Sequence, residues 1–160
     1  MNNQCTKFDA VIQTPVARLG ILFAGELLLS VEYLKPDQSL KKPVENHVSN
    51  LAEQIAEYFN NPVYQFKLNL KPKGTVFQQR VWQEMLRIAP GKVITYGEMA
   101  DRLSTSPRAV GNACRANPIP LIIPCHRVVS ASGLGGFAGA RSGYFTDIKR
   151  QLLLHEGLEF

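Results

Sequence analysis

The chain changes character at a break of sequence Lys-Pro-Lys-Gly, residues 71–74. Before this break, β-prone stretches are separated by turn residues, which predicts a small antiparallel meander. The stretches are residues 8–12, 20–24 and 27–34. After the break, short amphipathic helices dominate. We therefore expect an α+β protein, with a small β-sheet lobe over residues 1–73 and a mostly helical lobe over residues 74–160.

The first part also contains a helical pattern. Apolar residues recur at three- and four-residue spacings over residues 43–60, which predicts one amphipathic helix that stops before Pro62. Phe66, Leu68 and Leu70 then alternate with polar residues, and this alternation predicts one more strand.

Two capping boxes mark helix starts in the second part. Thr75 and Gln78 have the spacing of the first box, and Thr95 and Glu98 have the spacing of the second. We expect the second of these helices to run to about residue 103.

A further short helix follows, with Ser106 as its cap, Pro107 at its first position and Ala116 near its end. The two helices joined by residues 104–106 have the outline of a helix-turn-helix, an outline that many unrelated helix pairs share. This last helix carries Arg108 and Arg115 beside small residues, which suits close approach to a nucleic acid and equally suits tight packing inside the protein. The small residues are Ala109, Gly111, Ala113 and Ala116.

Charge favours a polyanionic partner. The chain has 18 Lys and Arg against 13 Asp and Glu, for a formal net charge of +5. The excess lies in residues 74–160, which carry 10 basic and 6 acidic residues against 8 and 7 in residues 1–73. Basic side chains that neutralise phosphates release counterions and so gain affinity.

The composition also indicates the cellular compartment. No apolar run approaches the length of a membrane span, and the polar start at residues 1–4 lacks the regions of a signal peptide, so we expect a cytoplasmic protein without a membrane partner. The three cysteines, Cys5, Cys114 and Cys125, form no disulfide framework and no CxxC pair, so we expect reduced thiols.

The most reactive constellation lies at residues 124–128, Pro-Cys-His-Arg-Val. The apolar residues 121–123 before it predict a buried strand that delivers Cys125 to a bend. A cysteine attacks as its thiolate, and His126 and Arg127 offer a base and a positive charge that would favour the thiolate. The alternative is that Cys125 is one more buried small hydrophobe.

The segment at residues 124–128 resembles the active-site motif of the O6-alkylguanine-DNA alkyltransferases, or methylated-DNA–protein-cysteine methyltransferases. Neighbouring segments match family motifs in family order; they are residues 77–82, 95–98, 108–111, 117–120 and 153–157. The resemblance covers nearly all of residues 74–160. Residues 1–73 match only the family's general layout, a β-sheet lobe that the resemblance makes RNase H-like.

The resemblance implies a role for each residue of the reactive site. Cys125 would accept the alkyl group, His126 would draw its proton through a water, and Glu156 would polarise His126. Asn117 would brace the site, and Tyr96 would hydrogen bond the damaged guanine and assist proton transfer to its ring nitrogen.

The resemblance also implies a substrate pocket. The main-chain carbonyls of Cys125 and Val128 would accept from the exocyclic amine of guanine. The loop of Phe137, Ala138 and Gly139 would line the pocket, with the main-chain N–H of Ala138 facing O6. Phe137 and Ala138 lack the hydroxyls common in that loop, so the polarity of this pocket differs from the family pattern.

The DNA contacts implied by the resemblance lie on the helix-turn-helix. Arg108 would enter the duplex in place of the flipped nucleotide, because a buried thiolate cannot reach an alkyl carbon while the base stays stacked. Ala109, Gly111, Arg115 and Thr95 would contact the DNA. The expected partner is double-stranded DNA that carries O6-alkylguanine, bound by a monomer located on the nucleoid if the source is a bacterium.

The chemistry implied is displacement at a saturated carbon, which a thiolate performs without a cofactor. Its thioether product has no electrophilic carbonyl for water to attack, so each molecule would act once. O4 of alkylated thymine stays open as a second substrate. We expect no metal, because Cys5 and His47 alone cannot form the zinc site of some larger members.

Two features depart from the family pattern. The turn between Tyr96 and Arg108 is short, and Pro107 directly before Arg108 is unusual. Residues 140–145 look like an insertion before the last helix, and Arg141 within it either adds a phosphate contact or does nothing.

Two rival functions stay open. A cysteine hydrolase would use Cys125, His126 and Glu156 as a triad and would turn over with water. A damage-sensing protein would bind alkylated guanine without repairing it, but such relatives lack the acceptor cysteine.

Overall fold

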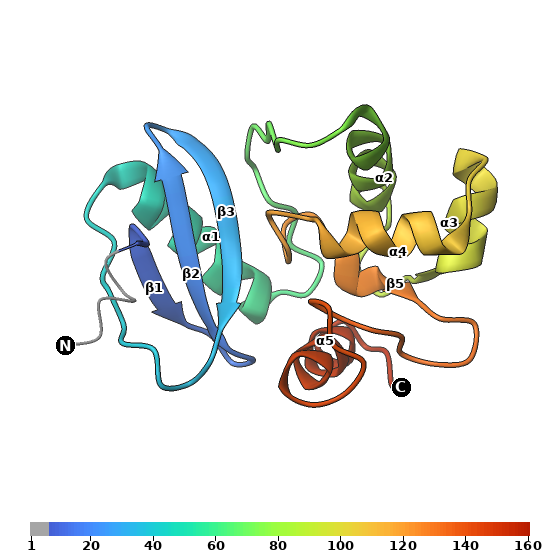
Figure 1. The fold of residues 1–160 in the computed structure, drawn as a ribbon. Helices are drawn as coiled ribbons and strands as arrows, with labels where there is room; N and C mark the ends of the chain where they lie inside the picture. The colour runs from blue at the N-terminus through green and yellow to red at the C-terminus, as the bar shows by residue number, and fades with distance from the viewer. Residues whose placement is uncertain (1–6) are drawn as a thin grey trace. The chain divides into compact units, whose positions relative to one another are not determined.

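The computed structural model describes residues 7–160, and the chain separates into two compact units (Figure 1). The first unit ends at Pro72 and the second spans Lys73–Phe160. The architecture is α+β, as predicted, with a three-stranded sheet and one helix in the first unit and a mostly helical second unit. Cys5 lies outside the described residues.

The first unit is built on an antiparallel meander of β1 (Ala10–Gln13), β2 (Arg18–Ala24) and β3 (Leu27–Leu34). All three predicted strands are confirmed, although β1 and β2 each begin two residues away from the predicted start. Gly25, with a φ of 59°, makes the turn between β2 and β3, a backbone conformation that favours glycine.

Helix α1 (Asn46–Asn60) ends where the apolar pattern predicts and begins three residues later than residue 43. Its apolar stripe is buried and consists of Val48, Leu51, Ile55 and Tyr58. The strand predicted at residues 66–70 is wrong, because this segment has no regular structure. The buried Gln54 side chain takes the place of a neighbouring strand, since its Oε1 accepts from Lys67 N at 2.8 Å and its Nε2 donates to Lys67 O at 3.3 Å.

Both capping boxes are confirmed in the second unit. Thr75 caps α2 (Val76–Leu86) with a reciprocal Gln78 bond, and Thr95 caps α3 (Tyr96–Leu103) in the same way with Glu98. These reciprocal bonds satisfy main-chain donors that a helix start otherwise leaves without a partner. The helix boundaries therefore follow from local chemistry.

The helix-turn-helix consists of α3, a turn through Ser104 in the left-handed conformation, and α4 (Pro107–Arg115). Ser106 caps α4 through Ala109 N at 3.1 Å and Pro107 occupies its first turn, as predicted. Trp82 of α2 donates from Nε1 to the Ala113 main-chain oxygen at 2.9 Å and so fixes α4 against α2.

The buried strand predicted at residues 121–123 is wrong. These residues are buried, but they form turns, with Leu121 at a φ of 75°. Asn117 closes the loop on itself, because it accepts from Ile119 N at 2.9 Å and donates to Ile123 O at 2.8 Å. The backbone groups that a strand would need are thereby used inside the loop. The nearest strand, β5 (Val128–Val129), follows the reactive segment and pairs in parallel with β4 (Ile94–Thr95).

The chain closes with α5 (Tyr144–His155), which begins after Gly143 at a φ of 90°. Tyr144 and Phe145, predicted within an insertion, are therefore the first residues of this helix. Within residues 7–160, no helix combines the length and apolar character needed to cross a bilayer. The same residues contain no group of three His, Cys, Asp or Glu side chains placed to hold a metal ion.

Candidate active site

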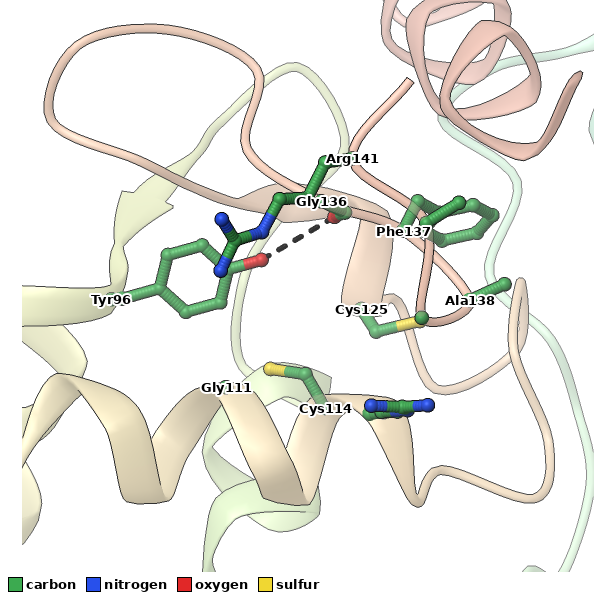
Figure 2. Close-up of a pocket in the computed structure, with 11 residues that line it drawn as sticks. Tyr96, Gly111, Cys114, Cys125, Gly136, Phe137, Ala138 and Arg141 are labelled. Carbon is green, nitrogen blue, oxygen red and sulfur yellow. Dashed lines mark hydrogen bonds between the residues drawn. The ribbon is translucent and has the colours of Figure 1, made fainter. Parts of the chain in front are cut away.

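Cys125 begins a single turn of 3-10 helix, η2 (Cys125–Arg127), directly before β5. Its side chain is 7% exposed and lines a cavity of about 240 Å³. Figure 2 shows this cavity between α4 and the loop before α5, with Tyr96 at one side. Cys125 is therefore buried and also forms part of the wall of a cavity.

His126, Arg127 and Glu156 form a buried network behind the cysteine. His126 Nε2 lies 2.8 Å from Glu156 Oε2. Arg127 donates to both oxygens of Glu156, from Nε to Oε1 at 2.9 Å and from Nη2 to Oε2 at 3.0 Å. Arg127 Nη1 also donates to the main-chain oxygen of Ile88 at 2.7 Å, and Gly91 N donates to Glu156 Oε1 at 3.3 Å. Both carboxylate oxygens of Glu156 are thus held in place by hydrogen bonds.

Glu156 stays ionised in this network. Burial alone raises the pKa of its carboxyl, but hydrogen bonds from His126 and Arg127 outweigh burial and leave the pKa below its usual value. Burial lowers the pKa of His126, and its bond to Glu156 offsets only part of that change. The imidazole is therefore neutral near neutral pH.

The bond to Glu156 sets the tautomer of His126. A carboxylate accepts only, so Nε2 carries the hydrogen and Nδ1 carries the lone pair. Nδ1 is buried and has no hydrogen-bond partner among the residues that the structure describes. This atom is an available base.

The Cys125 thiol is protonated at rest. Burial raises its pKa, while a hydrogen bond with the Asn117 side chain and the positive charge of Lys149 offset part of the rise. The thiol therefore needs a base before it can attack. Asn117, which braces the loop of residues 119–123, contacts the cysteine directly.

Tyr96 is half-buried on the wall of the same cavity, and its hydroxyl lies 3.5 Å from the main-chain oxygen of Gly136 (Figure 2). Burial raises the pKa of Tyr96, and the neighbouring thiols of Cys114 and Cys125 add to the rise. The phenol therefore keeps its proton and can donate it in a hydrogen bond.

The predicted pocket loop lines the cavity through Phe137, Ala138 and Gly139. The two main-chain carbonyls expected to bind the guanine amine already have one partner each. Val128 N donates to Cys125 O, and Lys149 Nζ donates to Val128 O at 2.6 Å. Each carbonyl oxygen retains a second lone pair.

The predicted DNA-contacting residues lie on α4, apart from Thr95, which caps α3. Arg108 and Arg115 are exposed, whereas Val110 and Ala113 are buried against the protein. A Cβ built on Gly111 would meet no atom within 4 Å, so this face of α4 is open. The Thr95 hydroxyl oxygen accepts from Glu98 N at 3.0 Å, and its hydrogen can still be donated.

Sequence reasoning missed two residues of this site. Lys149 of α5 is fully buried, and its Nζ donates to Val128 O and to Gly136 O at 3.0 Å. It supplies the positive charge near the thiol that we expected from Arg127. Cys114 also lines the cavity. The only sequence signal for Lys149 is that a lysine stands on the apolar side of the α5 pattern. Nothing in the sequence signals Cys114.

Comparison with known proteins agrees with this arrangement. Residues 76–158 match the family model described as 6-O-methylguanine DNA methyltransferase, DNA binding domain. The methylated-DNA–protein-cysteine methyltransferase of Methanosarcina acetivorans is 37% identical over 94% of this chain and 98% of the relative. The protein of that name from Mycobacterium tuberculosis is 37% identical over 80% of this chain and 82% of the relative. The crystal structure of Mycobacterium tuberculosis OGT in complex with DNA is 36% identical, with a TM-score of 0.76 over 91% of this chain and 90% of that one.

The fold and site together define a protein with a DNA-binding helical unit and a buried thiol backed by a histidine and a glutamate. The chain belongs to the methylated-DNA–protein-cysteine methyltransferase family, so the resemblance found in residues 74–160 is confirmed.

Proposed function

We propose that this protein repairs duplex DNA by moving an alkyl group from O6 of guanine to Sγ of Cys125, once per molecule. The observation that carries the proposal is the pairing of Cys125, which lines an open cavity, with the unpartnered Nδ1 of the adjacent His126. Family membership supports the reaction class, because the relatives compared are methylated-DNA–protein-cysteine methyltransferases.

The chemical step is a displacement at the alkyl carbon. His126 Nδ1 takes the thiol proton through a water, since adjacent residues place the imidazole poorly for direct contact with Sγ. The thiolate forms the new carbon–sulfur bond while the carbon–O6 bond breaks. The electron pair of the broken carbon–O6 bond passes to O6 and the guanine ring. Guanine takes one proton at its ring nitrogen, so the thiol proton is balanced and the products are a thioether and normal guanine.

Glu156 holds the imidazole for this step. The ionised carboxylate accepts from Nε2 and stabilises the positive charge that forms when Nδ1 takes the proton. Arg127 fixes the carboxylate through two bonds, so the geometry of His126 is set before substrate binds.

Binding of the damaged base uses the cavity wall. Tyr96 keeps its proton at rest because its pKa is raised, donates a hydrogen bond to the base, and passes that proton to the ring nitrogen as O6 leaves. The proton taken up by His126 then restores the phenol through water, so both side chains return to their neutral forms. The main-chain N–H of Ala138 faces O6, and the carbonyls of Cys125 and Val128 take the exocyclic amine on their second lone pairs.

Access requires that the nucleotide leave the duplex. A stacked base cannot bring its O6 substituent to the sulfur of Cys125, a residue that is only 7% exposed. Arg108, exposed near the start of α4, fills the gap left in the stack, while Thr95, Ala109, Gly111 and Arg115 lie against the backbone. O4-alkylthymine offers the same kind of carbon and is the candidate second substrate.

Intact-protein mass after incubation with duplex DNA carrying O6-methylguanine tests the proposal. We expect one added methyl group, absent in Cys125→Ala. Unchanged mass with DNA bound would instead identify a damage sensor, and many products per unmodified molecule would identify a hydrolase. A parallel reaction with O4-methylthymine tests the second substrate.

Arg108→Ala tests the role of the flipping residue. We expect slower transfer from duplex DNA and an unchanged rate with the free base O6-benzylguanine, because the free base needs no extrusion. Equal loss with both substrates would overturn the role given to Arg108.

A further inference from the structure

Two arginines line the cavity that holds the Cys125 side chain. Arg115 ends α4, and Arg141 belongs to the loop before α5. None of the described residues that line this cavity carries a carboxylate. Neither arginine forms an ion pair within residues 7–160, in contrast to Arg127 and Arg150. The cavity therefore presents positive charge that no protein group neutralises.

A tight turn precedes Arg141 and lies against Arg115. Phe137 N donates to Ala140 O at 2.8 Å, and Ala140 N donates to Phe137 O at 2.9 Å. Between them Ala138 and Gly139 have φ values of 51° and 81°, as in a two-residue hairpin turn. Arg141 leaves the turn directly, and Figure 2 shows its side chain directed toward Tyr96.

Arg115 packs against the same turn from the other element. A Cβ built on Gly139 would lie 3.0 Å from Arg115 Nε and 3.2 Å from its Cζ and Nη2. A side chain at residue 139 would force the guanidinium to move by a few tenths of an ångström, so the glycine lets it lie close to the backbone. The helix-turn-helix and the loop thus each place one guanidinium at a single cavity.

A methyl adduct offers no group that these two arginines could bind. The adduct carbon must meet Sγ of Cys125, and a methyl group there carries no acceptor. Guanidinium groups bind carboxylates and phosphates through paired N–H donors, and they are suited to oxyanions in particular. The chemistry of the wall therefore selects for an oxyanion that arrives together with the damaged base.

We propose that Arg115 and Arg141 form an anion subsite at the acceptor cavity, which binds an oxyanion carried by the damaged nucleotide. The oxyanion is the carboxylate of an O6-carboxyalkyl adduct or the phosphate of the flipped nucleotide. This inference rests on the proposed function, because the subsite is relevant only if the damaged base meets Cys125 in this cavity.

Single-turnover transfer rates with four substrates test the subsite. The substrates are free O6-benzylguanine, free O6-(4-carboxybenzyl)guanine, and duplexes with O6-methylguanine or O6-carboxymethylguanine. The variant is Arg141→Ala, and Arg87→Ala is the matched control because it removes an exposed arginine that lies outside the cavity. Both variants are checked by thermal unfolding, and rates are compared at low ionic strength, where exposed charges are least screened.

We expect Arg141→Ala to slow transfer about fivefold to tenfold wherever the oxyanion is present, which is less than a buried charged hydrogen bond gives, because solvent screens the exposed Arg141. Loss confined to the two carboxylated substrates assigns the subsite to the adduct. Loss on both duplexes alike, with both free bases unaffected, assigns it to the phosphate.

Wild-type rates for Arg141→Ala on all four substrates would overturn the subsite. So would an equal loss with neutral O6-benzylguanine, or the same losses in Arg87→Ala. Failure of the proposed function looks different, because the wild-type protein would then transfer no alkyl group to Cys125 from any substrate.

Discussion

His126 is the residue on which the reactivity of Cys125 depends. The thiol has a raised pKa and the imidazole a lowered one, so both are neutral near neutral pH. Attack then requires the proton to pass from Sγ to Nδ1 during the reaction, and Glu156 makes that transfer favourable by stabilising the imidazolium.

The dependence of the transfer rate on pH follows from this pairing. Between the two pKa values the amounts of neutral imidazole and thiol are constant, so we expect a nearly level rate constant from about pH 6.5 to pH 7. Burial lowers the pKa of Lys149 to about 8, so the rate should decline as this lysine loses its charge near that pH. In His126→Gln only solvent removes the proton, and the rate should fall overall and rise roughly tenfold per pH unit. Rapid-quench measurements of transfer at a series of pH values check this, and parallel profiles for the two proteins would contradict the role of His126.

Lys149 acts on the thiol through its charge and on the pocket loop through its bond to Gly136. Lys149→Met should slow transfer by roughly tenfold, because the developing thiolate loses a positive charge that favours it. The melting temperature should change less than for a lost core residue, because removing a buried charge offsets the lost hydrogen bonds. Lys92→Met, at an exposed lysine, is the control, and an unchanged rate in Lys149→Met would exclude the electrostatic role.

At the scale of elements, the turn of residues 137–140 stores local strain. Ala138 has a φ of 51°, which costs a residue with a Cβ roughly 1 kcal/mol. Ala138→Gly should therefore raise the free energy of unfolding by about 0.5–1 kcal/mol and keep the main-chain N–H at this position. Gly139→Ala should lower it, because Gly139 has a φ of 81° and Arg115 lies against it. Urea unfolding of both variants gives the signs, and a shift of the same sign in both would contradict this account of the turn.

The elements that sequence alone could predict are those fixed by neighbours in the chain. The capping boxes at Thr75 and Thr95 and the cap at Ser106 are local, and all three helices begin where these residues indicate. The strands expected at residues 66–70 and 121–123 fail because Gln54 and Asn117 side chains take up the backbone groups. Such long-range or loop-closing bonds leave no periodic signal.

In the candidate active site, too, the sequence predicts the residues that belong to a local motif and misses those brought in by packing. Pro124–Val128 stands out as a motif, and Glu156 follows from the family resemblance. Lys149 and Cys114 join the site only through packing, since neither is near Cys125 in a recognisable pattern. Arg127 was expected beside the thiol and instead binds Glu156 and the Ile88 carbonyl.

For the whole molecule, the buried network links stability to pH. Folding lowers the pKa of His126 below its unfolded value of 6.5. At a pH between the folded and the unfolded pKa, the unfolded chain binds more protons than the folded one, so acid favours unfolding. The pKa of Glu156 is likewise below 4.5 when folded, so its contribution is present above that value and lost as pH falls through the folded pKa. We expect the free energy of unfolding to fall in two stages, first below 6.5 and then below 4.5.

Urea unfolding at a series of pH values from neutral to acid measures both stages. His126→Gln should lack the first stage and keep the second, because glutamine does not titrate. A wild-type unfolding free energy that stays constant through the first window would show that His126 is not held neutral by burial.

The most direct test of the central claim is the stoichiometry and position of the transferred group. The protein is titrated with excess duplex DNA that carries an isotope-labelled methyl group on O6 of guanine, and is then digested with trypsin. Cleavage after Arg115 and Arg127 separates the peptide that contains Cys125 from the one that contains Cys114. We predict that label reaches one methyl group per chain and lies wholly in the Cys125 peptide. Label in the Cys114 peptide, or repeated demethylation without label on the protein, would contradict the account.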